Sequence, residues 1–127
     1  MGRIYRLSCK VCGYEDDLKI GAGLMSIREK VLETLLEKAD LEEWKKLKND
    51  NKVMFFAWEF NPAYCDKCNE LKACVSVKII TNDNEKLYLG CRCKECQRQL
   101  EALDIGSDIK CTSCKSVLQK AIVGNWD

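Results

Sequence analysis

The chain has 127 residues, enough for one compact domain or two very small ones. Its 21 basic and 20 acidic residues give a formal charge of +1, which argues against a strongly electrostatic binder of nucleic acid or membranes. The sequence contains no histidine, so Ser-His-Asp and Cys-His catalysis and all histidine-bearing metal sites are excluded. The longest apolar run, residues 53–58, is too short to span a membrane, and the N-terminus lacks the apolar core of a signal peptide. We therefore expect a cytoplasmic protein without membrane association.

The N-terminal third predicts a strand pair followed by a helical segment. Residues 3–8 and 14–20 read as two partner strands, and residues 21–23 (Gly-Ala-Gly) as a flexible turn, because the lysine of a phosphate-binding P-loop is missing. Ser26 and Glu29 form a capping box that predicts a helix start.

Apolar residues at helical spacing follow this start. They are Ile27, Val31, Leu32, Leu35, Leu36 and Ala39. Asp40 and Glu43 repeat the capping pattern, so either a second helix begins there or the first helix continues.

The middle of the chain predicts strands. Residues 53–60 (VMFFAWEF) are aromatic-rich and indicate a buried strand, not a base-stacking platform, because no basic residue is interleaved. Residues 71–79 alternate apolar and polar, as in a half-buried strand. The Asn-Asp-Asn turn at 82–84 then predicts a hairpin with residues 86–91 as the returning strand.

Ten cysteines, roughly 8% of the chain, signal a disulfide scaffold or a metal protein. Without a secretory signal, metal binding is the better interpretation. Four Cys-x-x-Cys pairs each supply half of a tetrahedral site, so we expect two zinc ions with four cysteine ligands each. The predicted ligands are Cys9, Cys12, Cys65, Cys68, Cys93, Cys96, Cys111 and Cys114.

The pairing of these half-sites has three solutions: sequential, nested and interleaved. The last two pairs are separated by 14 residues, close to the spacing of a zinc ribbon. Loop closure favours sequential pairing by roughly 1 kcal/mol. We therefore expect residues 1–91 to form a zinc-binding region with a helical insertion and a hairpin, and residues 92–127 a C-terminal zinc ribbon.

Iron is the alternative metal, because Cys12-Gly13-Tyr14 is similar to the first cysteine turn of rubredoxin. Against iron, Gln97 and Lys115 follow two of the other pairs, and these residue types adopt a positive φ less readily than glycine. Cys74 and Cys91 remain outside the pairs and are expected on neighbouring strands, as inert residues, spare ligands or a redox pair.

The opening CKVCGYEDDLKIGAG, the middle EEWKKL and the closing CKEC and CTSC resemble small uncharacterised bacterial zinc-ribbon proteins. The resemblance implies zinc binding through the eight paired cysteines and no established activity. The expected fold is α+β, a small antiparallel sheet with rubredoxin-like zinc ribbons and one or two inserted helices.

We expect no enzymatic activity, because four thiolates leave no open position on the metal. Near-neutral charge and an amphipathic helix favour a module that binds a protein partner. A nucleic-acid-binding ribbon is the alternative, because six basic residues surround the last two cysteine pairs. They are Arg92, Lys94, Arg98, Lys110, Lys115 and Lys120. A thiol redox sensor using Cys74 and Cys91 is the third possibility.

Overall fold

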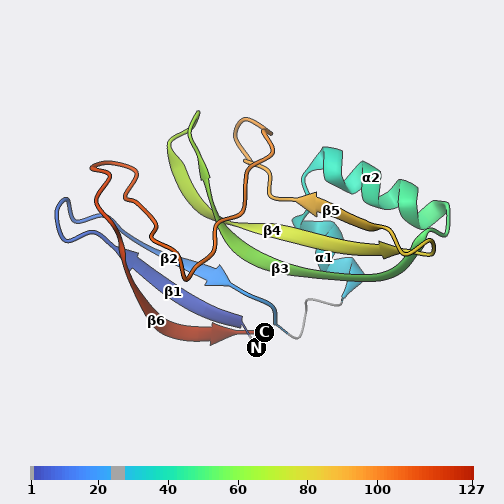
Figure 1. The fold of residues 1–127 in the computed structure, drawn as a ribbon, viewed down its shortest axis with the longest axis horizontal. Helices are drawn as coiled ribbons and strands as arrows, with labels where there is room; N and C mark the ends of the chain where they lie inside the picture. Colours follow the sequence, from blue (N-terminus) through green and yellow to red (C-terminus); the bar gives the residue numbers. More distant parts are fainter. Residues whose placement is uncertain (1, 24–27) are drawn as a thin grey trace.

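The computed structural model describes residues 2–23 and 28–127. Its elements in chain order are β1 (Gly2–Ser8), β2 (Glu15–Ile20), α1 (Glu29–Leu35), α2 (Lys38–Asn49), β3 (Val53–Cys65), β4 (Glu70–Thr81), β5 (Lys86–Gly90) and β6 (Gln119–Trp126). The strands form two three-stranded antiparallel sheets, ordered β2-β1-β6 and β3-β4-β5 (Figure 1). The fold is thus α+β, as expected, but with two sheets in place of one. No helix in the described ranges is long and apolar enough to cross a membrane.

The first sheet joins the two ends of the chain. Strand β1 pairs with β2, which confirms the predicted N-terminal strand pair, and on its other side with β6. The N- and C-termini therefore lie side by side (Figure 1). Its core contains apolar side chains such as Leu7, Leu18 and Leu118, packed with Leu71 from the other sheet.

The second sheet contains the predicted hairpin. Strands β4 and β5 pair around the turn at residues 82–84, and β3 runs along the other side of β4. In β4 the side chains of Leu71, Val75, Val77 and Ile79 are buried, which confirms the alternation predicted for residues 71–79.

Two helices, and not one continuous helix, cover one face of this sheet. Helix α2 begins two residues before Asp40, with Glu37 as its N-cap, so the predicted capping role of Asp40 is wrong. The predicted capping box at Ser26 lies outside the described residues. Trp44 of α2 and Leu32 of α1 are fully buried against Trp58, Val77 and Ile79.

Strand β3 is longer and more exposed than predicted. Of residues 53–60 only Trp58 is buried, whereas Met54 and Phe55 are exposed. The reason is that the helices cover a single face of the sheet, so alternate side chains of β3 point to the other face.

The two sheets are linked at the predicted Gly-Ala-Gly turn. Gly21 and Phe60 exchange backbone hydrogen bonds of 2.8 and 2.9 Å. Gly21 has a φ of +89°, a conformation that glycine adopts without steric cost. This turn is therefore a structural junction between the end of β2 and the middle of β3.

Candidate metal centres

Eight cysteines lie in two groups of four, and each group could hold one metal ion. We call the first group the outer site, because it consists of the first and the last cysteine pair along the chain. It joins the loop after β1 to the loop before β6 and contains Cys9, Cys12, Cys111 and Cys114. We call the second group the inner site, because it consists of the two pairs between them. It joins the β3–β4 turn to the loop after β5 and contains Cys65, Cys68, Cys93 and Cys96. In Figure 1 the two loops of each site lie next to each other.

The pairing is nested, so the expected sequential pairing is wrong. The first Cys-x-x-Cys pair joins the fourth, and the second joins the third. Residues 92–127 consequently do not hold a four-cysteine site by themselves, although a boundary between residues 91 and 92 stays a prediction. The two groups fit zinc-ribbon-like repeats, but the sequence of half-sites differs from the one that loop closure favours.

The sulfur–sulfur distances fit a tetrahedral metal ion. In the outer site, Sγ of Cys9 lies 3.4 Å from that of Cys114, and Sγ of Cys12 lies 3.4 Å from that of Cys111. The corresponding inner-site distances are 3.6 and 3.8 Å. Four thiolates at about 2.3 Å from a zinc ion would be about 3.8 Å apart along each tetrahedral edge. Because a disulfide requires about 2.05 Å, these contacts match ligands of one ion and not covalent bonds.

Each Cys-x-x-Cys turn ends in the same backbone conformation. The residue after each second cysteine has a positive φ: Gly13 at +80°, Asn69 at +52°, Gln97 at +62° and Lys115 at +65°. Gln97 and Lys115 thus adopt this conformation, although their residue types do so less readily than glycine. A left-handed residue at this point reverses the chain, so that both sulfurs of the turn face the same side.

Backbone hydrogen bonds stabilise three of these turns in the same way. The amide of Cys9 donates to the carbonyl of Tyr14 at 2.8 Å, and the amide of Gly13 donates to the carbonyl of Cys9 at 3.0 Å. Equivalent bonds surround Cys93 and Cys111. The turns are therefore held by the backbone as well as by any bound ion.

Within each site, the pKa of one thiol is lowered and the pKa of another is raised. Hydrogen bonds from the hydroxyl and the backbone N–H of Ser116 lower the pKa of Cys114 to about 6. The backbone N–H of Cys96 is the main cause that lowers the pKa of Cys93 to about 7. These donors favour a thiolate, which is the metal-binding form of cysteine.

The partners of these thiolates hold their protons. Loss of hydration and a hydrogen bond to Cys93 raise the pKa of Cys68 to about 12. The backbone N–H of Tyr14 acts to lower the pKa of Cys12, but the bond to Cys111 and loss of hydration together raise it to about 12. If all four thiols of one site lost their protons, four thiolates within 4.8 Å would repel one another. A bound divalent cation offsets this repulsion.

A buried ion pair ties helix α2 to the inner site. Nε of Arg92 donates to Oδ2 of Asp40 at 2.9 Å, and the Asp40 carboxylate is 4% exposed. Arg92 also donates to the carbonyl of Gln97, whose side-chain amide donates to Glu37 at 2.9 Å. No sequence pattern indicates this contact, because its partners are 52 positions apart and Asp40 resembles a helix cap.

Cys74 and Cys91 belong to neither group of four within the described residues. Cys74 lies in β4, as predicted, whereas Cys91 lies one residue beyond the end of the neighbouring strand β5, near the open end of the hairpin.

Comparison of the chain with protein-family models, curated proteins and solved structures found no significant match.

Proposed function

We propose that the chain is a structural zinc protein in which two ions, each bound by four cysteines, hold a protein-binding surface in place. The zinc assignment is supported by the all-sulfur ligand sets and by sulfur–sulfur distances of 3.4–3.8 Å. Zinc favours tetrahedral thiolate sites, and four protein ligands leave no position for substrate. We accordingly assign a structural role and no catalysis to the metal.

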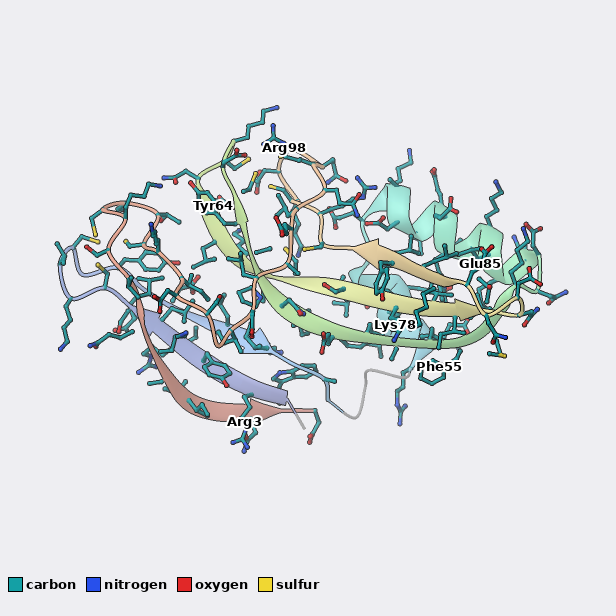
Figure 2. The ribbon with its side chains drawn as sticks, viewed as in Figure 1. Arg3, Phe55, Tyr64, Lys78, Glu85 and Arg98 are labelled. Atoms are coloured by element: carbon teal, nitrogen blue, oxygen red, sulfur yellow. The ribbon has the colours of Figure 1, made fainter. Side chains whose placement is uncertain are left out.

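The contact surface that we propose is the face of the β3-β4-β5 sheet opposite the helices. Phe55, which is 50% exposed, lies on it at one edge, and Tyr88, which is 66% exposed, at the other. Lys78 lies directly opposite Tyr88 in the strand register. Figure 2 shows Phe55 and Lys78 on this sheet, away from the cysteine turns near Tyr64 and Arg98.

A groove of about 520 Å³ runs along the same face. Its lining includes Ala57, Asn61 and Lys78, together with Tyr88 at the β5 edge. Lys78 and Glu59 both line the groove, and Phe55 is exposed on the same face outside it. Exposed aromatic residues beside charges of both signs suit an extended protein segment with apolar and charged side chains. The groove with the exposed aromatic residues of this face is the observation that supports the protein-binding assignment.

A protein partner fits the charges better than a nucleic acid. Eight thiolates and two zinc ions would change the formal charge from +1 to about −3. Four of the six basic residues near the last two cysteine pairs are held by other groups of the chain. They are Arg92, Arg98, Lys115 and Lys120. Lys120, for example, donates to the carbonyl oxygens of Ile105 and Ser107 at 2.7 and 2.6 Å.

The metal is tested by native mass spectrometry on protein purified without added metal. We expect two zinc ions per chain. Iron in either site, or fewer than two ions, would contradict the assignment.

The surface is tested by capture from a nuclease-treated lysate on the immobilised, zinc-loaded chain. The test variant is Phe55→Ser combined with Tyr88→Ser, and the matched control is Ile122→Ser, an exposed apolar residue of the other sheet. A protein retained by the wild type and the control, but lost by the double variant, supports the proposal. Equal retention of the protein by all three chains refutes the proposal. A parallel capture from untreated lysate that yields only nucleic acid refutes it as well.

A further inference from the structure

Cys74 and Cys91 lie beside each other where the β4–β5 ladder ends, and both line the same cavity. The backbone amide of Cys91 donates to the carbonyl of Val75 at 2.7 Å, which places Cys91 beside the Cys74 region of β4. Cys91 is the main cause that raises the pKa of the Cys74 thiol, as expected for neighbouring thiols. Sγ of Cys74 also lies 3.9 Å from the carbonyl oxygen of Arg92.

The backbone around Cys91 is shaped for this contact. Gly90 and Cys91 have consecutive positive φ values of +93° and +56°. A Cβ at Gly90 would lie 2.2 Å from the carbonyl oxygen of Val75, so only glycine fits there. The chain leaves the regular strand at this point, while Cys91 remains bonded to β4.

The surroundings of the two thiols differ from those of inert packing cysteines. Neither side chain belongs to the two apolar core clusters of the described residues. Both line a cavity of about 160 Å³ whose wall carries charges of both signs, from Lys72, Arg92 and Lys94 and from Glu37, Asp40 and Glu70. Cys65 and Cys93 of the inner site border the same cavity.

We propose that Cys74 and Cys91 are a reversible dithiol–disulfide pair, oxidised by exchange with a small-molecule disulfide of the glutathione class. One cysteine thiolate attacks a sulfur of the small disulfide; a mixed disulfide forms and one small thiolate leaves. The second cysteine thiolate then attacks the protein sulfur of the mixed disulfide, and the other small thiolate leaves. The protein loses two electrons and two protons, and the small disulfide is reduced to two thiols.

Oxidation at this pair has a defined structural consequence. The bond would join β4 to the segment that enters the inner site, because Cys91 precedes Cys93 by two positions. It would stabilise that segment without using a ligand of either ion. The pair is thus a redox site separate from the two groups of four cysteines.

The test equilibrates the zinc-loaded full chain with oxidised glutathione. Free thiols are then alkylated in denaturant, and the protein is analysed by intact mass and peptide mapping. A parallel native mass spectrum gives the number of zinc ions. We expect two fewer alkyl groups than the fully reduced chain carries, a linked peptide containing Cys74 and Cys91, and an unchanged number of zinc ions. Reduced glutathione in excess should reverse the change.

Single variants supply the control. Cys74→Ser and Cys91→Ser should each stop at the mixed disulfide with glutathione, whereas the wild type proceeds to the internal bond. Peptide mapping of the wild type needs no variant, so a folding defect in either variant leaves the test valid. Failure to form the internal bond, or loss of zinc in step with oxidation, would overturn the proposal. The zinc count before oxidation separates that result from failure of the zinc assignment.

Discussion

The contact between Asp40 and Arg92 gives a sharp test of how helix α2 is attached. Asp40→Asn keeps the size of the side chain and removes its charge. The carboxylate is 4% exposed and Arg92 is 24% exposed, so the substitution leaves a largely buried guanidinium without its anion.

The expected cost follows from this burial. Removing one partner of a fully buried ion pair costs about 3–5 kcal/mol. Arg92 keeps its bond to the carbonyl of Gln97 at 3.1 Å and retains some contact with water. Both features reduce the penalty, so we expect the free energy of unfolding to fall by about 2–3 kcal/mol.

The assay is urea unfolding of the zinc-loaded chain, followed by tryptophan fluorescence, because Trp44 is buried in the same helix. The matched control is Asp17→Asn, which breaks the exposed pair with Arg6 and should cost less than about 1 kcal/mol. Equal costs for the two variants would show that the Asp40 contact does not hold the helix, and the argument from burial would be wrong.

Three further predictions concern the metal sites. Gly13→Ala should lower the free energy of unfolding by about 1 kcal/mol, because the backbone φ is +80° at this position, although no atom lies within 4 Å of the added Cβ. Gly106→Ala is the control, because that position requires no positive φ, and it should change the free energy of unfolding by less than about 0.5 kcal/mol. Cys12→Ser should abolish one zinc site, and adding Cys111→Ser should remove no further zinc, whereas adding Cys65→Ser should remove the second ion. Sequential pairing predicts the reverse for these two double variants, and native mass spectrometry would detect it. The pKa of Cys93 in the metal-free chain is lowered to about 7, so below that pH zinc must displace one more proton on binding; zinc affinity measured with a chelating dye should therefore fall more steeply with decreasing pH below about 7 than above it, and an affinity that is the same at pH 8 and pH 5 would contradict this.

Local patterns in the sequence predicted the individual elements well. The alternation in residues 71–79 and the turn at 82–84 correctly indicated the β4–β5 hairpin, because both signals depend on neighbouring residues. The Cys-x-x-Cys pairs correctly indicated two groups of four cysteines. Burial of β3 was overestimated, because composition alone does not reveal that the helices cover only one face of its sheet.

The pairing of the half-sites depends on the tertiary fold. The loop-closure argument treats the intervening residues as flexible chain, and its preference is only about 1 kcal/mol. In the structure, β6 pairs with β1 from Gly2 to Ser8, which brings the first and last cysteine turns together. Seven residues of strand pairing outweigh so small an entropic difference. No short-range pattern marks residues 119–126 as the partner of residues 2–8, so this arrangement was beyond the sequence argument.

Nested pairing gives the two sites different mechanical roles. The outer site closes a loop of nearly the whole chain, whereas the inner site closes the 24 residues between Cys68 and Cys93. If a metal bridge restricts the unfolded chain as a disulfide does, the outer closure contributes about 4.7 kcal/mol and the inner closure about 3.5 kcal/mol. The inner site has a second attachment, because Arg92 bonds to helix α2 beside it. Loss of the outer ion therefore leaves the two chain ends joined by the β1–β6 pairing alone, while loss of the inner ion leaves its loop anchored to the helix.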